Sequence, residues 1–298
     1  MYDIIVVGAG PAGMTAALYA KRAGRSVLVV EKEIIGGQIT YSPSVENYPF
    51  IKKISGMELA DSLFEQINEL GAEIEFDRVK AIEVDGDIKR VICEDATFEG
   101  RAVIIAGGAK HKKLGLERED DFIGSGVSYC AVCDGAFFKG KTAAVVGGGN
   151  TALQDALYLA DLCKNVYLIH RRDSFRGDAE LVNKLRERSN VEIVTPANII
   201  SLLGDKLLSG VELDNGRRIL LDGLFVAVGQ SPENQPFSNV IDIDDGGYAD
   251  SDESCNTKTS GIFVAGDCRK KSVRQLATAV ADGATAATHA CEYLDKEI

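Results

Sequence analysis

The feature that most constrains this chain is a strand, glycine turn and helix unit that occurs twice. In the first copy, the apolar run at 4–7 leads into Gly8-Ala9-Gly10-Pro11-Ala12-Gly13 and an alanine-rich run. In the second copy, the apolar run at 143–146 leads into Gly147-Gly148-Gly149-Asn150-Thr151-Ala152 and a similar run. Each unit continues into another strand-like segment, at 27–30 and 166–169. The repeat predicts an α/β fold with two Rossmann-like three-layer dinucleotide-binding domains.

Each glycine of the turn has a separate physical role. The first permits the tight turn from strand to helix, and the second lets the backbone approach a pyrophosphate. The third position, Gly13 or Ala152, lets the helix pack closely on the strand. The pyrophosphate then lies at the helix N-terminus, where backbone N–H groups have no partner. Glycine turns in an unrelated α/β protein are the alternative, which the flanking strands and helices disfavour.

The two copies differ at the end of the following strand, where nucleotide specificity is set. Glu31 ends the first of these strands, and a carboxylate there accepts hydrogen bonds from ribose hydroxyls and repels a 2′-phosphate. This predicts FAD or NAD. The second strand ends in His170-Arg171-Arg172, with Arg176 close behind. Arginines can hold a 2′-phosphate by bidentate hydrogen bonds, which predicts NADPH; a solvated basic surface is the alternative.

A strand-like segment near the C-terminus ends in Gly266-Asp267. A carboxylate at such a strand end can accept hydrogen bonds from the ribityl hydroxyls of a flavin, which favours FAD over NAD at the first glycine loop. An ordinary turn, in which glycine and aspartate are both common, is the alternative.

The chain carries one closely spaced cysteine pair, Cys130-Ala131-Val132-Cys133, followed by Asp134. Two cysteines at this spacing can close and reopen a disulfide, one thiolate attacking a substrate and the other resolving the mixed disulfide. Asp134 could give a proton to a departing thiolate, although Asp-Gly is also a common turn pair. The total of seven cysteines is odd, so a secreted disulfide framework is disfavoured.

Composition excludes several other classes of function. A zinc site needs four ligands, and the three histidines are scattered with no second Cys-x-x-Cys, so we predict no metal. The net charge of −12 disfavours nucleic acid and anionic membranes as partners. No apolar run approaches the ~20 residues of a membrane-spanning helix. No signal peptide is recognisable at the start of the chain, so we predict a cytoplasmic protein.

The ordered set of motifs resembles the low-molecular-weight thioredoxin reductases over nearly the whole chain. The matching segments are 8–13, 36–38, 45–49, 126–135, 147–152, 170–176, 266–267 and 274–275. The resemblance implies a homodimeric FAD flavoprotein that passes electrons from NADPH through the flavin to a Cys130–Cys133 disulfide, and then to thioredoxin or a thioredoxin-like protein. It also implies that one domain turns against the other, because nicotinamide and disulfide alternate at the flavin.

The same resemblance implies a discontinuous FAD-binding domain, residues 1–113 and 240–298. An NADPH-binding domain, residues 114–239, is inserted into it and carries the cysteine pair. Cys133 corresponds to the sulfur nearer the flavin, but the sequence leaves open which cysteine meets the partner. For FAD, the expected contacts from motifs and resemblance together are Gly8, Gly10, Pro11, Ala12, Gly13, Glu31, Gly37, Gln38, Asn47, Gly266, Asp267, Arg274 and Gln275. For NADPH they are Gly147, Gly149, Asn150, Thr151, Ala152, His170, Arg171, Arg172 and Arg176.

The chain departs from the pattern of the family at three places. Gly107 stands where a threonine is usual, Ser125 where a basic residue is frequent, and Phe50 where a glycine is usual. The change at Phe50 predicts a different shape for the loop that follows Asn47.

Three functions remain open at this point. A thioredoxin-disulfide reductase is the first. The second keeps the fold but takes electrons from ferredoxin, or oxidises dithiols with oxygen; such relatives tend to lose the second glycine loop or the arginine cluster, and this chain keeps both. The third is a flavin-bound redox sensor without catalysis, for which the sequence supplies no output module.

Overall fold

The computed structural model describes residues 1–296, which form two compact units. The first consists of Met1–Lys110 and the chain from Ser231 onward, and the second of His111–Gln230. Both boundaries fall before the expected domain ends at 113 and 239. The later boundary moves because the 3₁₀ helix η3 (Gln235–Phe237) buries Phe237 in the core of the first unit.

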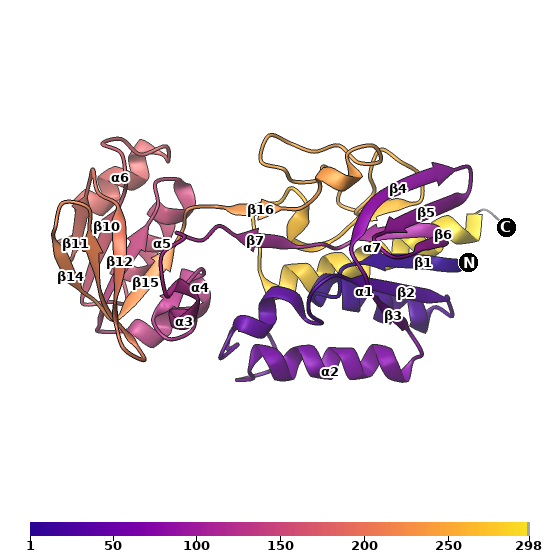
Figure 1. Cartoon of the computed structure of the whole chain (residues 1–298), viewed down its shortest axis with the longest axis horizontal. Helices are drawn as coiled ribbons and strands as arrows, with labels where there is room; N and C mark the ends of the chain where they lie inside the picture. Colours follow the sequence, from indigo (N-terminus) through magenta and orange to yellow (C-terminus); the bar gives the residue numbers. More distant parts are fainter. Residues whose placement is uncertain (297–298) are drawn as a thin grey trace. The chain divides into compact units, whose positions relative to one another are not determined.

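The first unit is built on a seven-stranded sheet (Figure 1). Its strands are β1 (Tyr2–Val7), β2 (Val27–Glu31), β3 (Glu73–Phe76), β4 (Val79–Asp85), β5 (Ile88–Cys93), β6 (Thr97–Ile105) and β17 (Ile262–Val264). β3, β2, β1 and β6 are parallel neighbours, and β17 pairs parallel with β6. β4 and β5 continue antiparallel from β6, so β4, β5 and β6 form an antiparallel meander.

Helices cover one face of the parallel strands, and β4 and β5 pack over the other face. The helices are α1 (Pro11–Arg22), α2 (Gly56–Glu69) and α7 (Leu276–Lys296). Side chains alternate along β1, so Ile4 packs toward the helices while Ile5 packs against Ile82 and Val91 of the meander. α7 lies so close to α1 that a Cβ on Gly283 would be 2.2 Å from the carbonyl oxygen of Ala12.

A hydrogen bond at Gln275 marks the start of helix α7. Its first residue is Leu276, because the backbone N–H of Gln275 donates to Thr278 Oγ1 at 3.0 Å and so caps the helix at this point. The connections between the two units are β7 (Ala109–His111) and β16 (Gln230–Pro232), which pair with each other.

The second unit repeats the layered plan. Its five-stranded parallel sheet has the order β11-β10-β9-β15-β8. These strands are β8 (Val127–Ser128), β9 (Thr142–Val146), β10 (Asn165–Ile169), β11 (Val191–Val194) and β15 (Gly223–Val226). A three-stranded antiparallel sheet covers one face: β12 (Ile199–Gly204), β13 (Leu208–Leu213) and β14 (Arg218–Leu220).

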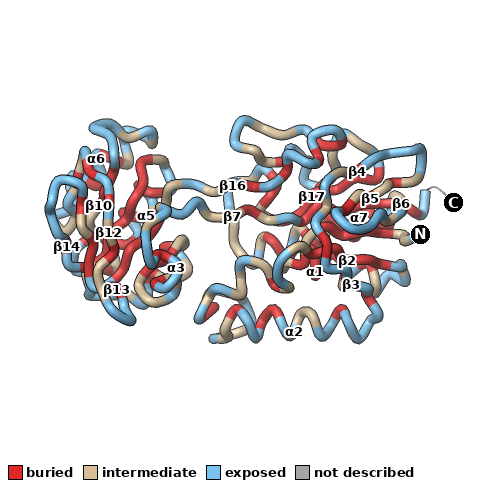
Figure 2. Tube along the Cα trace, in the orientation of Figure 1, coloured by how far each residue is buried: buried red, intermediate tan, exposed pale blue. Residues whose placement is uncertain are grey.

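Helices α5 (Asn150–Ala160) and α6 (Ala179–Arg186) pack on the other face of that sheet. Two short helices, α3 (Glu119–Phe122) and α4 (Ala131–Asp134), and the 3₁₀ helix η2 (Gly135–Phe138) complete the unit. The central strands of both sheets are buried on both faces (Figure 2). Two three-layer α/β units with parallel sheets confirm the predicted fold class; in each unit the third layer is antiparallel β structure.

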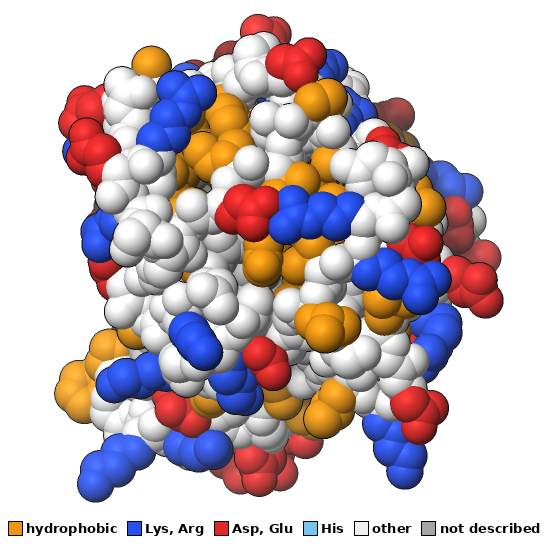
Figure 3. Space-filling view, turned by 90° about the vertical axis from the view of Figure 1, so that its left-hand side faces the viewer, with side chains coloured by type: hydrophobic (Ala, Val, Ile, Leu, Met, Phe, Trp, Pro, Cys, Tyr) orange, Lys and Arg blue, Asp and Glu red, His pale blue; other side chains and the backbone are white. Residues whose placement is uncertain are grey.

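The surface and the helices give two further facts. Within residues 1–296, none of the helices combines the length and the apolar character that crossing a membrane requires. On the face seen in Figure 3, acidic and basic side chains are interspersed, with no extended area of one sign.

Candidate active site and nucleotide loops

The two closely spaced cysteines form a disulfide at the start of a short helix. Cys130 and Cys133 are bonded, with their Cα atoms 5.3 Å apart. Cys130 is the N-cap residue of α4, and its Sγ accepts a hydrogen bond from the backbone N–H of Cys133 at 3.2 Å. Both residues are partly exposed, so this pair is accessible while each of the other cysteines, Cys93, Cys163, Cys255, Cys268 and Cys291, is buried.

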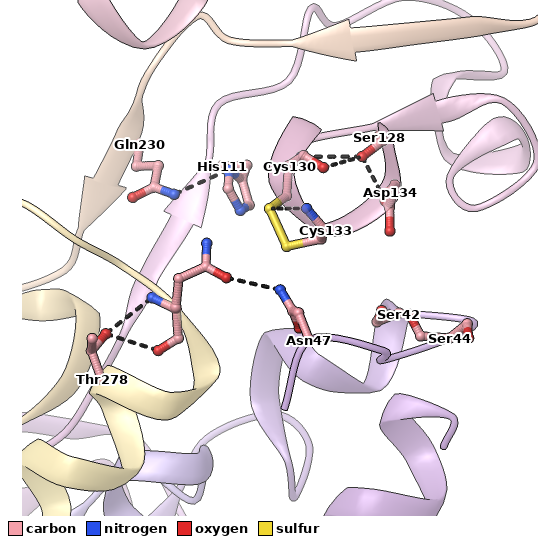
Figure 4. Close-up of a disulfide and its surroundings, with 11 residues drawn as sticks. Ser42, Ser44, Asn47, His111, Ser128, Cys130, Cys133, Asp134, Gln230 and Thr278 are labelled. Atoms are coloured by element: carbon pink, nitrogen blue, oxygen red, sulfur yellow. Dashed lines mark hydrogen bonds between the residues drawn. A yellow bond between two sulfur atoms is a disulfide. The ribbon is translucent and has the colours of Figure 1, made fainter. Parts of the chain in front are cut away.

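A serine that the sequence analysis missed holds the carboxyl group beside this disulfide (Figure 4). Ser128 Oγ donates to Asp134 Oδ2 at 2.6 Å and accepts from the backbone N–H of Cys130 at 3.1 Å. Asp134 Oδ1 is buried without a hydrogen-bond partner among residues 1–296. Burial raises the pKa of Asp134, and the Ser128 hydroxyl opposes that rise only in part. The carboxyl group directly after Cys133 therefore holds a proton more readily than an exposed aspartate does.

Tyr129, which precedes Cys130, is held on two sides. Its hydroxyl donates to Glu119 Oε1 at 2.9 Å, and its ring stacks on His111 with the ring centroids 5.1 Å apart. His111 Nδ1 in turn lies 3.3 Å from Gln230 Nε2. Glu119 is buried and accepts backbone hydrogen bonds from Leu114, Gly115 and Leu116. None of these partners could be found from spacing, because they come from separate segments of the second unit.

The first glycine loop has the close approaches that its sequence predicts. A Cβ on Gly8, whose φ is +106°, would lie 2.5 Å from the carbonyl oxygen of Ala106, and one on Gly13 would lie 1.8 Å from that of Gly8. Gly10 differs, since a Cβ there would meet nothing within 4 Å. Gly10 is the N-cap of α1 and no side chain caps that helix. The loop thus presents unpaired backbone N–H groups at an open position, which fits a pyrophosphate.

Glu31 lies beside the first glycine loop and Asp267 lies at the end of a strand, as expected for a flavin nucleotide. Glu31 Oε2 accepts from the backbone N–H of Ala9 at 2.6 Å, which places the carboxylate against the loop. Asp267 follows β17, in the 3₁₀ helix η4 (Gly266–Cys268). Its Oδ1 is buried and accepts no hydrogen bond from the described residues, although Lys271 Nζ is 3.4 Å away. Burial raises the pKa of Asp267, while Lys271 lowers it. An acceptor oxygen without a donor fits a ribityl hydroxyl.

Several other residues expected at FAD come together in the first unit. Asn47 Nδ2 donates to Gln275 Oε1 at 3.1 Å, which joins segments from opposite ends of the chain (Figure 4). A Cβ on Gly37 would lie 3.5 Å from the Cα of Gly10, so the 3₁₀ helix η1 (Gly37–Tyr41) lies beside the glycine loop. Gln38 is exposed in the same 3₁₀ helix.

Arg274 is already bound within the protein. Its Nε donates to the carbonyl oxygen of Asp267 at 3.3 Å, and its guanidinium lies 4.0 Å from the centroid of the Tyr248 ring.

The second glycine loop is built in the same way. A Cβ on Gly147 would lie 2.3 Å from the carbonyl oxygen of Ala227, whereas one on Gly149 would meet nothing within 4 Å. Gly149 is the N-cap of α5, again without a side-chain cap. Asn150 is expected at the nucleotide, but its amide group exchanges hydrogen bonds with Asp178 of the same unit.

His170 lies on the second loop. A Cβ on Gly148 would lie 2.2 Å from His170 Cε1, so the imidazole ring covers this glycine, which the sequence analysis did not include among the contacts. The ring stacks on Phe175 with centroids 5.2 Å apart, and its Nε2 is buried with no hydrogen-bond partner in the described part of the chain. Burial lowers the pKa of His170, and three nearby arginines lower it further.

The three predicted arginines lie on a segment that folds back onto this loop. The backbone N–H of Arg176 donates to the carbonyl oxygen of Gly148 at 2.8 Å. Arg171, Arg172 and Arg176 are exposed, and across residues 1–296 none of them forms an ion pair with a carboxylate. Three uncompensated cations beside an open helix N-terminus fit a nucleotide that carries an additional phosphate.

The described part of the chain, residues 1–296, contains no group of three or more His, Cys, Asp or Glu that could hold a metal ion.

Comparisons with known proteins agree with this geometry. The family described as pyridine nucleotide-disulphide oxidoreductase matches residues 2–283. A thioredoxin reductase of Listeria monocytogenes is 41% identical, covering 99% of this chain and 95% of that protein. The crystal structure of the thioredoxin reductase from Streptococcus pyogenes has a TM-score of 0.95 at 39% identity, covering 99% of both chains. A ferredoxin-flavin thioredoxin reductase from Clostridium acetobutylicum has a TM-score of 0.55 at 33% identity, with 99% and 98% covered.

Proposed function

Because this chain belongs to the thioredoxin reductases of the pyridine nucleotide-disulphide oxidoreductase family, it is an FAD- and NADPH-dependent oxidoreductase, and we propose that Cys130 and Cys133 carry its electrons to thioredoxin or a thioredoxin-like protein. The observation that carries this proposal is the accessible Cys130–Cys133 disulfide with a partly buried carboxyl group, Asp134, next to it in the chain. A disulfide in this setting can be reduced and can exchange with a second disulfide.

We assign FAD to the first glycine loop. Gly8, Gly10 and the N-terminus of α1 would hold the pyrophosphate, Glu31 the ribose, and Asp267 the ribityl chain. Asn47 and Gln275 are placed together in the same unit, and Gly37 lies beside the loop. The open position at Gly10 and the unbonded Oδ1 of Asp267 support this assignment.

NADPH is assigned to the second loop. Gly149 and the N-terminus of α5 would hold its pyrophosphate, and Arg171, Arg172 and Arg176 its 2′-phosphate. The absence of carboxylate partners for these arginines in residues 1–296 supports the assignment. A bound FAD would supply two-electron transfer between NADPH and the Cys130–Cys133 disulfide.

The reduced cysteines then perform a thiol–disulfide exchange. One thiolate attacks the disulfide of the partner, forming a mixed disulfide and releasing one partner sulfur as a thiolate. The second cysteine attacks its neighbour's sulfur in the mixed disulfide, which releases the other partner sulfur and restores the Cys130–Cys133 bond. Asp134, held by Ser128, donates a proton to a departing thiolate.

Assembly and location complete the proposal. We propose that the enzyme is a cytoplasmic homodimer that binds neither nucleic acid nor membrane. The net charge of −12 supports the exclusion of anionic partners. Analytical ultracentrifugation of the purified protein tests the dimer, since a mass near 31.9 kDa would show a monomer.

An anaerobic titration of the flavin-loaded protein tests the function. We expect NADPH to bleach the flavin absorbance, NADH to do so only at higher concentration, and oxidised thioredoxin to restore the absorbance. The Cys133→Ser variant is the control, because without the disulfide its flavin should remain reduced when thioredoxin is added. A lack of bleaching by either nucleotide would contradict the proposed donor, and bleaching by reduced ferredoxin would then favour the ferredoxin-dependent alternative.

A further inference from the structure

One carboxylate on α7 anchors the turn that carries Asp267. Asp282 Oδ2 accepts from the backbone N–H of Gly266 at 3.0 Å and from Lys271 Nζ at 2.9 Å. Its other oxygen, Oδ1, accepts from Arg269 Nη1 at 2.9 Å. All three donors come from the short turn at 266–271. Only 13% of the Asp282 side chain is exposed, so these contacts form in a largely dry environment, where charge-assisted hydrogen bonds are strong.

Lys271 connects this anchor to Asp267. Its Nζ is shared between Asp282 at 2.9 Å and Asp267 Oδ1 at 3.4 Å, and its side chain is 12% exposed. Lys271 Nζ also donates a hydrogen bond to Thr278 Oγ1 at 3.4 Å. Lys271 thus neutralises two carboxylates that would otherwise repel each other.

Arg269 binds a different part of the chain from Lys271. Besides Asp282, its guanidinium donates to Ser251 Oγ and to the carbonyl oxygen of Asp252, each at 3.0 Å. Its polar groups are therefore directed at the loop around 251–252. Of the three cations on the turn, Arg269, Lys270 and Lys271, only Lys271 pairs with Asp267 within residues 1–296.

The position of this turn is tied to the first glycine loop. Gly266 has a φ of +80°, and a Cβ there would lie 2.7 Å from the Cβ of Ala12, at the start of α1. The turn therefore packs on the helix whose N-terminus faces the proposed pyrophosphate. A ligand that reaches from Gly10 to Asp267 requires these two parts to keep a fixed separation, and the Asp282 anchor maintains it.

We propose that Lys271 and Asp282 are positioning residues for the flavin half of FAD, with Asp282 fixing the turn at 266–271 and Lys271 holding the Asp267 carboxylate in place. The inference rests on the proposed binding of FAD at the first glycine loop, and goes beyond it by assigning roles to two residues that no motif contains. The adenosine and pyrophosphate half of the nucleotide does not depend on this pair.

The Lys271→Met variant tests the proposal, because methionine keeps much of the side-chain volume and removes the charge. Asp267 then lies beside Asp282 without its cation, so the carboxylate is repelled from its position or becomes protonated. A charge-assisted hydrogen bond contributes enough that we expect the dissociation constant of the apoprotein for FAD to rise about 10-fold to 100-fold. Lys271→Arg keeps the charge and should restore most of the affinity.

Two controls separate positioning from general damage. ADP contains the adenosine and pyrophosphate but no ribityl chain, so its dissociation constant should be the same in wild type and Lys271→Met. The matched variant is Lys258→Met, whose Nζ is also 2.9 Å from a carboxylate, Asp242 Oδ1, but whose side chain is 41% exposed. It should bind FAD like wild type. Asp282→Asn is a second test variant, because it keeps the size of the side chain and removes its charge. It should also weaken the binding of FAD more than the binding of ADP.

The experiment is a fluorescence titration of each apoprotein with FAD and with ADP. A loss confined to FAD in Lys271→Met and Asp282→Asn, with rescue by Lys271→Arg, supports the proposal. Unchanged FAD affinity in both variants overturns it, as does an equal loss for FAD and ADP, which would show a structural role only. If wild-type apoprotein bound no FAD, that result would contradict the proposed function itself, and it would be distinct from an effect of the Lys271 and Asp282 variants.

Discussion

Replacing Arg171 and Arg172 by alanine should convert a preference for NADPH into near indifference between NADPH and NADH. The two guanidinium groups are exposed and have no carboxylate partner in residues 1–296, so their removal breaks no internal ion pair. The backbone of the loop is held by the Arg176 N–H at the carbonyl oxygen of Gly148, a contact that alanine at 171 and 172 leaves intact. The two substitutions therefore remove only the positive charges that would face the nucleotide.

The magnitude follows from the exposure of the arginines. A hydrogen bond to a charged group contributes about 1.5–3 kcal/mol, but an exposed ion pair is weakened by solvent to about 1 kcal/mol or less. At about 1 kcal/mol for each arginine, the double variant should lose about 30-fold in kcat/KM for NADPH. NADH lacks the 2′-phosphate, so its kcat/KM should change little.

The assay is steady-state reduction of thioredoxin at varied NADPH and NADH, in wild type and the double variant. Arg186→Ala is the matched control, because Arg186 is also exposed in the second unit but lies on α6, outside the 170–176 segment. We expect kcat for NADPH to persist at saturation while KM rises. Equal losses with both nucleotides, or an equal effect of Arg186→Ala, would refute the assignment of the 2′-phosphate to these arginines.

Three further predictions concern single side chains. In stopped flow, Asp134→Asn should slow the reoxidation of the reduced enzyme by thioredoxin at least ~10-fold and leave flavin reduction by NADPH unchanged. In wild type the reoxidation should slow as the pH rises through the raised pKa of Asp134, and the variant should lose that pH dependence. Burial raises the pKa of Asp155 from 3.8 to about 6, so between these values the unfolded chain holds fewer protons and stability falls as the pH rises. Asp155→Asn should therefore stabilise the protein by ~1–2 kcal/mol at pH 7 and by nothing near pH 3, as measured by urea unfolding, and equal gains at both pH values would contradict the argument. Phe50 has a φ of +74° and a fully exposed side chain, so Phe50→Gly should relieve left-handed strain and leave thermal stability unchanged or raise it by up to ~1 kcal/mol, whereas a clear loss would show that the ring has a packing role.

The loop at Phe50 also shows what a family pattern can and cannot predict. The replacement of the usual glycine led us to expect a loop of different shape. The backbone at Phe50 nevertheless adopts a positive φ, the conformation that glycine adopts most readily. We infer that the surrounding segment determines the path of the loop and imposes it on the phenylalanine.

The sequence by itself determined the parts of this protein that depend on local geometry. The turn from strand to helix needs glycine at Gly8 and Gly147, where φ is +106° and +156°, so both loops were predictable from short segments. The disulfide was predictable for the same reason, since two residues between cysteines place the sulfurs within reach in a helical turn. The chemistry at the strand ends, Glu31 and Arg171, followed from the position of these residues after each strand.

Only the tertiary structure decided which side chains support those motifs. Ser128 holds Asp134, His170 covers Gly148, and Asp282 anchors the turn around Asp267. Asp282 is on a helix that also packs against α1, and its three donors converge only after β17, the turn and α7 have folded together. Backbone turns impose their residue types locally, whereas the partners of a buried polar side chain are set by which elements pack beside it. For this reason the chemistry of the site could be predicted from the sequence, and its supporting contacts required the fold.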